Sequence, residues 1–146
     1  MYIQIINGPN LNLLGKRNPE IYGSETFEDT FEKLRKDLSH LRFEYAQSNS
    51  EGEIIDLIQH HGFDSDCAGI ILNPGAYAHY SIAIADAIEA IPAPVVEVHI
   101  SNIHAREDFR HQSVTARSAR ALIAGCGRYG YTLAARYIEN ISDTAL

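Results

Sequence analysis

The sequence contains little cysteine and lacks the patterns in which cysteine usually does chemistry. Its two cysteines, Cys67 and Cys126, lie far apart, without a CxxC pair or the histidine spacing of a zinc site. These absences argue against the common zinc-binding and dithiol redox motifs. We expect both cysteines to be small buried residues in a reducing compartment.

A long hydrophobic run is also missing. No stretch approaches the roughly 18 apolar residues of a membrane span. The first ten residues, MYIQIINGPN, have neither the basic start nor the extended apolar run of a secretory signal. We therefore expect a soluble, cytoplasmic protein without a membrane partner.

Positive charge is scarce as well. Twelve Lys and Arg residues against nineteen Asp and Glu give a formal net charge of −7, which argues against nonspecific binding to nucleic acid or an anionic membrane. Most of the cations are arginine, and Arg17, Arg106 and Arg110 lie beside dense polar motifs. Arginine suits bidentate binding of carboxylate or phosphate, so a few local arginines would have to hold any anionic ligand.

No linker, internal repeat or low-complexity segment divides the chain. Its 146 residues are 45% hydrophobic and 21% charged, which is typical of an ordinary globular protein. We expect residues 1–146 to form a single domain with a sizeable core.

Apolar runs alternate with segments of helical periodicity. We expect strands at residues 2–6, 43–47, 68–72, 95–100 and 120–124. Between and after them we expect a helix capped by Thr26 and Asp29, a helix from Ser50 to Gly62, and helices at 80–90 and 131–141. This alternation predicts an α/β protein with a flavodoxin-like, doubly wound parallel sheet of order 2-1-3-4-5 and helices on both faces.

Polar residues gather where three of these strands end. In such a sheet, ligands bind at the carboxyl ends of the strands, where the strand order reverses. The loops at residues 7–23, 73–79 and 99–110 are therefore expected to converge on one pocket. The first loop matches neither GxGxxG nor a Walker motif, so the motifs that usually indicate binding of a dinucleotide or a nucleoside triphosphate are missing from it. Gly15 and Gly23 bracket a segment that could close over a ligand.

Several residues in these loops suit acid–base chemistry or binding, and each also has a structural interpretation. Glu97 and His99 are two apart on a strand, so the carboxylate can orient an acid or base histidine, although a buried pair can be purely structural. His79 could be a half-buried helix-start histidine, and Asn73 could cap its own turn.

The remaining polar residues of these loops leave the same choice open. Arg17 could be a solvated cation and Tyr22 a packing residue. The spacings of His99, His104 and His111 match no zinc motif, so we expect no metal.

Three segments together resemble one family. They are residues 6–15 (INGPNLNLLG) with Arg17 and 20–23 (EIYG), residues 72–76 (LNPGA) with His79, and residues 97–110 (EVHISNIHAREDFR). In this order, and at the ends of the expected strands, they resemble the type II 3-dehydroquinate dehydratases, and the similarity runs essentially from end to end.

The resemblance implies a cofactor-free anti elimination of water. The substrate would be 3-dehydroquinate and the product 3-dehydroshikimate, formed through an enolate in the third step of the shikimate pathway. Tyr22 would be the proton acceptor and Arg17 would stabilise the transition state. His99 would be the proton donor, with Glu97 behind it and Asn10 alongside.

The same resemblance implies the substrate-binding residues and an assembly. Asn73, His79 and Arg110 would bind substrate hydroxyls, and the backbone N–H groups of Ile100 and Ser101 would hold the carboxylate. Asp86 would reach the active site of a neighbouring subunit, which implies trimers, usually four of them in a dodecamer. Without the resemblance, Asp86 would be interpreted as an exposed helical residue.

Other functions fit the residues less well. A receiver domain needs acidic residues after the first strand and an aspartate after the third, where this chain has Asn7 and Asn73. A flavin carrier would need a phosphate-binding Ser/Thr-rich loop after the first strand. A homologue retained only as a binding scaffold is a further alternative. The dehydration itself would serve either aromatic biosynthesis or quinate breakdown.

Overall fold

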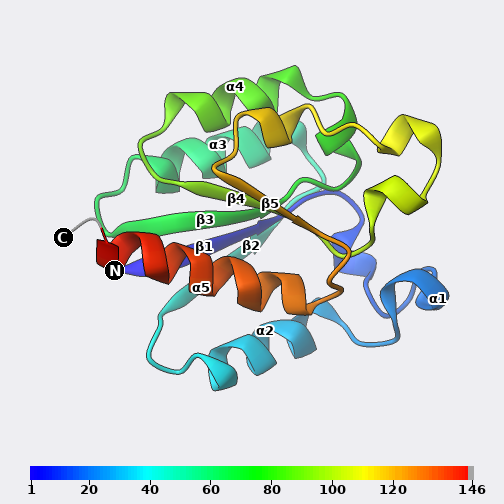
Figure 1. Cartoon of the computed structure of the whole chain (residues 1–146), viewed down its shortest axis with the longest axis horizontal. Coiled ribbons are helices and arrows are strands. Elements are labelled where there is room, and N and C mark those ends of the chain that lie inside the picture. The colour runs from blue at the N-terminus through cyan, green and yellow to red at the C-terminus, as the bar shows by residue number, and fades with distance from the viewer. Residues whose placement is uncertain (145–146) are drawn as a thin grey trace.

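The structure, a computed structural model, describes residues 1–144, without the side chains of Ile21 and Tyr22. Five parallel strands form one sheet in the order β2-β1-β3-β4-β5 (Figure 1). The strands are β1 (Tyr2–Asn7), β2 (Phe43–Gln47), β3 (Cys67–Asn73), β4 (Val95–His99) and β5 (Ala121–Ala124). The predicted fold class and strand order are confirmed.

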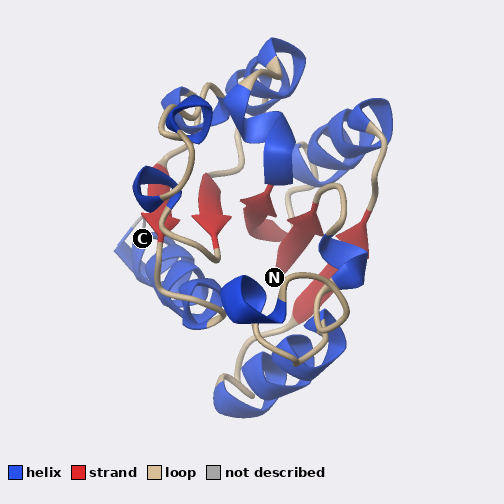
Figure 2. Ribbon diagram, turned by 90° about the vertical axis from the view of Figure 1, so that its right-hand side faces the viewer, coloured by secondary structure: helices blue, strands red, loops and turns tan. Residues whose placement is uncertain are grey.

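Helices cover both faces of the sheet (Figures 1 and 2). One face carries α2 (Phe27–Asp37) and α5 (Tyr129–Thr144), and the other carries α3 (Glu51–Gly62) and α4 (Ile82–Ala90). Alternate strand residues enter the two cores: Ile5 and Ile71 pack towards α2 and α5, and Ile70 packs towards α3 and α4. Burial on both faces explains why the central strands are nearly continuous apolar runs.

Side-chain caps set where the helices begin. Thr26 accepts a hydrogen bond from the Asp29 amide at 3.2 Å, and the Asp29 carboxylate accepts one from the Thr26 amide at 3.0 Å, which is the predicted capping box. Ser81 Oγ accepts from the Ile84 amide at 3.0 Å. For this reason α4 begins at Ile82, two residues later than the sequence patterns predict.

The sequence patterns miss several short helical segments in the loops. A four-residue helix, α1 (Pro19–Tyr22), lies in the loop after β1. The 3-10 segments are η1 (Leu11–Leu13), η2 (Gly75–His79), η3 (Ile103–Ala105), η4 (Asp108–Arg110) and η5 (Thr115–Arg117). All but η5 belong to the three loops expected to form the pocket.

The two cysteines differ in exposure. Cys67 is buried at the start of β3, as expected, but the prediction that Cys126 is buried is wrong. Cys126 lies after the end of β5, between Gly125 and Gly127, which both have positive φ, so it sits in a tight turn outside the core. Across residues 1–144, no helix is long and apolar enough to span a membrane.

Candidate active site

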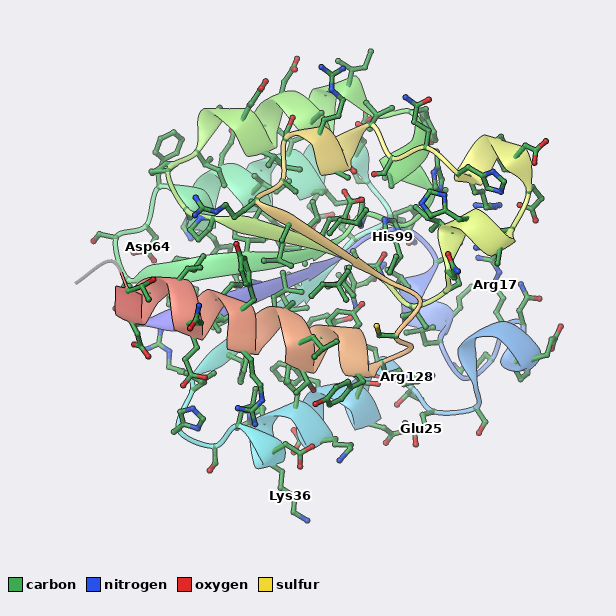
Figure 3. All side chains as sticks on the ribbon, viewed as in Figure 1. Arg17, Glu25, Lys36, Asp64, His99 and Arg128 are labelled. Atoms are coloured by element: carbon green, nitrogen blue, oxygen red, sulfur yellow. The ribbon has the colours of Figure 1, made fainter. Side chains whose placement is uncertain are left out.

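A cavity of about 250 Å³ lies at the carboxyl ends of β1, β3 and β4. Its lining contains eight of the residues predicted from the sequence: Asn10, Arg17, Asn73, His79, His99, Ile100, Ser101 and Arg110. Figure 3 shows His99 and Arg17 at this end of the molecule and Asp64 at the opposite end. The fold thus brings together groups that lie up to 100 residues apart in the chain.

Two glycines allow the loops after β1 and β3 to approach each other. A Cβ atom on Gly8 would lie 2.6 Å from the Pro74 carbonyl oxygen, and Gly75 has a positive φ of 59° and faces Pro9. Asn10 also has a positive φ, 69°, and its amide donates to Asn49 Oδ1 at 3.0 Å. The position of Asn10 at the cavity therefore depends on the loop after β2 as well as on its own.

The segment that carries Arg17 runs along one side of the cavity. Gly15 and Gly23, which bracket it, both have positive φ, and α1 lies between them. Arg17 is exposed and lines the cavity. Tyr22 ends α1, but its side chain is outside the described residues.

Arg128, just before α5, binds the chain that follows this segment. Its Nη1 donates to the Thr26 carbonyl at 3.0 Å and to Thr30 Oγ1 at 2.9 Å, and its Nη2 donates to the Glu25 carbonyl. Figure 3 shows Arg128 and Glu25 side by side where α5 meets the beginning of α2. The segment is therefore anchored just beyond Gly23.

His99 and Glu97 form a buried pair at the end of β4. Their side chains share one face of the strand, and His99 Nε2 lies 2.8 Å from Glu97 Oε2. Glu97 is fully buried, whereas His99 reaches the cavity. Because a carboxylate only accepts, His99 donates through Nε2 and its Nδ1 is the nitrogen available for a ligand. Such a pair can deliver a proton to a bound molecule.

His79 stands opposite, with its ring centroid 6.2 Å from that of His99. Its Nδ1 donates to the Gln112 carbonyl at 2.8 Å, which leaves Nε2 as an acceptor. Burial lowers the pKa of His79, and the nearby His99 and Arg110 lower it further, against the hydrogen bond to Gln112. A neutral His79 suits binding of a hydroxyl group.

Arginine gives the cavity a local positive charge in an acidic protein. Arg17, Arg106 and Arg110 all line it. Arg110 Nε lies 2.5 Å from Glu107 Oε2, and this contact holds the pKa of Glu107 below its usual range. The cavity is therefore suited to a small anionic ligand.

Asp86 is the predicted residue that the structure places elsewhere. It is exposed on α4 and does not line the cavity of its own chain. In the described part of the chain, no three His, Cys, Asp or Glu side chains come together as metal ligands, although the rings of His104 and His111 lie 5.9 Å apart.

Sequence reasoning missed several residues that support or line the cavity. The sequence marks Arg106 as a cation beside a polar motif but assigns it no role, whereas the structure places it in the cavity lining. Tyr131, Ser113 and Thr115 hold Asn73 and Glu97 from behind, although they lie far from them in sequence. No spacing in the sequence signals these contacts.

Comparison with known proteins gives one consistent family. The family model described as "Dehydroquinase class II" matches residues 1–139. The chain is 51% identical over 142 residues to "3-dehydroquinate dehydratase 1" of Agrobacterium fabrum, covering 96% of this chain and 97% of that protein. It is 54% identical over 134 residues to the 3-dehydroquinate dehydratase of Halalkalibacterium halodurans, covering 90% and 91%.

A solved structure agrees in fold along nearly the whole chain. The crystal structure of type II dehydroquinase from Butyrivibrio crossotus superposes with a TM-score of 0.90 at 44% sequence identity. The match covers 95% of this chain and 97% of that one.

Proposed function

Since this chain belongs to the class II dehydroquinase family, we propose that it is a type II 3-dehydroquinate dehydratase, a hydro-lyase of class EC 4.2.1.10. It would remove water from 3-dehydroquinate to give 3-dehydroshikimate. The observation that carries the proposal is the His99–Glu97 pair, 2.8 Å apart, at a cavity that three arginines line. The cavity suits a small carboxylate, and the pair suits protonation of a departing hydroxyl.

The proposed elimination takes place in two proton transfers. Tyr22 removes the proton from the carbon beside the ketone, which gives an enolate. His99 then protonates the hydroxyl on the next carbon, so that the C–O bond breaks, a C=C bond forms and water leaves in the anti sense. Return of the proton from Tyr22 to His99 through solvent restores the enzyme. Because the ketone acidifies the proton and His99 assists the leaving group, no cofactor or metal is required.

Tyr22 needs help to act as a base. A free phenol has a pKa of about 10, so action near neutral pH requires a shift of about 2–3 units, or about 3–4 kcal/mol. We assign this help to Arg17, which belongs to the same loop and would also stabilise the transition state. The role of Tyr22 rests on its place in the motif at 20–23. Closing the loop over the substrate would exclude water and strengthen these interactions.

Other residues around the cavity would position the substrate. Asn73, His79 and Arg110 are proposed to bind its hydroxyls, and Asn10 to lie beside the group that leaves. The backbone N–H groups of Ile100 and Ser101 would hold its carboxylate. Backbone donors suit an anion in a protein of net charge −7.

We propose that residues 1–146 act as one catalytic domain in the cytoplasm and that copies assemble into trimers, four of them in a dodecamer. Asp86 would then reach the cavity of a neighbouring subunit. Its exposure on α4, outside the cavity of its own chain, supports this arrangement.

The test is ultraviolet absorbance of the purified protein mixed with 3-dehydroquinate, with and without prior treatment with a chelator. We expect absorbance from the conjugated enone product to rise equally in both samples and to stay flat with His99→Asn. A folded, oligomeric wild-type protein that gives no rise would contradict the proposal and favour a ligand-binding scaffold.

A further inference from the structure

Beneath the cavity, Glu97 is enclosed by three donors. Its Oε2 accepts from His99 Nε2 at 2.8 Å and from Ser113 Oγ at 2.6 Å, and its Oε1 accepts from Thr115 Oγ1. Glu97 and Thr115 are both fully buried, with no exposed surface. Ser113 and Thr115 do not line the cavity, so they touch the chemistry only through Glu97.

The chemistry of these groups fixes the direction of the hydrogen bonds. An ionised carboxylate only accepts, so both hydroxyl hydrogens are committed to Glu97. Ser113 Oγ in turn accepts from the Ala116 amide at 3.1 Å, which fixes its rotamer. Hydrogen bonds of this kind stabilise the charged form of a buried carboxylate.

The same short segment also holds the second histidine of the cavity. The Gln112 carbonyl accepts from His79 Nδ1 at 2.8 Å, and the Val114 amide donates to the Ala78 carbonyl at 2.7 Å. One stretch of chain outside the cavity therefore orients both rings, because it binds His79 directly and binds His99 through Glu97.

We propose that residues 112–115 are the positioning segment of the active site and that the hydroxyls of Ser113 and Thr115 keep the proton of the Glu97–His99 pair on the histidine. This inference rests on the proposed function, in which His99 must carry a proton to the leaving hydroxyl. Ser113 and Thr115 are positioning residues because they act through Glu97. Without their hydrogen bonds, Glu97 would compete with His99 for that proton.

Other titratable and charged side chains face the Glu97–His99 pair, and the variants that test the proposal leave them in place. His79 stands opposite His99 on η2, and Arg17, Arg106 and Arg110 line the same cavity. The variants below alter none of them, so any change belongs to the hydroxyls.

The decisive variant is Thr115→Val, which keeps the shape of the side chain and removes its hydroxyl. We expect kcat to fall about 10-fold or more, as for loss of a hydrogen bond to a charged group, with KM within about twofold. We expect the alkaline limb of the pH profile of kcat to move to higher pH. In the deprotonated pair, the Glu97 carboxylate has no imidazolium beside it and depends more on the Thr115 hydroxyl. Loss of that hydroxyl therefore destabilises the deprotonated pair more than the protonated pair, so the pair keeps its proton to higher pH.

Thr115→Ser is the matched control, because it keeps the hydroxyl and loses only a methyl group. Thr115→Ser should keep most of the wild-type kcat, in contrast to Thr115→Val. If both variants are equally impaired, or if Thr115→Val has the wild-type kcat and pH profile, the proposal is overturned. Should Thr115→Val fail to fold, Ser113→Ala tests the donor to the other carboxylate oxygen with the same expectations.

A readout independent of activity separates this inference from the proposed function. In protein labelled with ¹⁵N-histidine, the His99 signals, assigned by their loss in His99→Asn, should show both ring nitrogens protonated in the wild type below the alkaline limb. In Thr115→Val they should shift towards the neutral ring. Unchanged signals overturn the positioning role even if the wild type is active. A wild type without dehydratase activity overturns the proposed function, while the spectra still decide the role of Thr115.

Discussion

Asn73, which lines the cavity, is held from behind by Tyr131. Asn73 Nδ2 donates to the Tyr131 hydroxyl at 3.1 Å, and that hydroxyl donates to Asn7 Oδ1 at 2.8 Å. Tyr131 is fully buried in α5, whereas Asn7 and Asn73 end the neighbouring strands β1 and β3. One phenol thus fixes the polar ends of two central strands at the point where the strand order reverses.

Replacing Tyr131 with phenylalanine should therefore weaken both stability and substrate binding. The change leaves two buried amides without this partner, and we expect the free energy of unfolding to fall by about 1–3 kcal/mol. KM should rise, because Asn73 loses its support. Urea denaturation and steady-state kinetics measure the two effects. Tyr137→Phe, in a half-buried tyrosine of the same helix, is the control; equal stability of Tyr131→Phe and wild type would count against the bridge.

Tyr22→Phe tests the proposed base. The substitution keeps the ring and removes the group that accepts the proton, so turnover should be abolished while substrate binding stays largely intact. Enone absorbance measures the turnover, and calorimetric titration with 3-dehydroquinate measures the binding. Substantial residual turnover would refute the assignment of Tyr22.

Asp86→Ala tests the contribution of a neighbouring subunit. We expect lost activity or weaker trimers, because Asp86 is exposed on α4 and would act on the cavity of another copy. Sedimentation measures the mass in solution alongside the kinetics. Glu89→Ala removes a second exposed carboxylate of the same helix and serves as the control. Wild-type activity and mass in Asp86→Ala would rule out the role.

Two tyrosines of the α2 and α5 side should make the protein sensitive to alkali. Burial raises the pKa of Tyr45 to about 12 and raises that of Tyr131 above its usual 10. A pKa raised by folding means that the unfolded chain releases its protons first. The stabilisation is then complete below pH 10 and is lost as pH rises through the folded-state values.

The expected loss has a slope that urea denaturation can measure. Between about pH 10 and 12, each tyrosine should remove about 1.4 kcal/mol of unfolding free energy per pH unit. Tyr45→Phe should make this dependence shallower, because Tyr45 then no longer contributes to it. A stability that stays constant over this range would contradict the burial of both phenols.

The fold was largely predictable because its signals are local. Apolar runs marked the strands, and the Thr26–Asp29 capping box marked the beginning of α2. The sequence patterns failed where the chain depends on distant contacts or on tight turns. Helix α1 is too short to show a periodicity, and Cys126 lies in a turn between two glycines rather than in the core.

By itself, the sequence determined the strand order, the three loops at the cavity and the placement of Glu97 and His99 on one face of β4. These features follow from local sequence patterns, namely side-chain alternation along a strand and the succession of strands and helices, together with the general rules of parallel sheets. Only the tertiary structure decided which buried side chains form hydrogen bonds with the residues of the site. Thr115 reaches Glu97 across 18 positions and Tyr131 reaches Asn73 across 58, and no local spacing encodes such contacts. They form because a buried carboxylate or amide must find a hydrogen-bond partner wherever the packed chain supplies one.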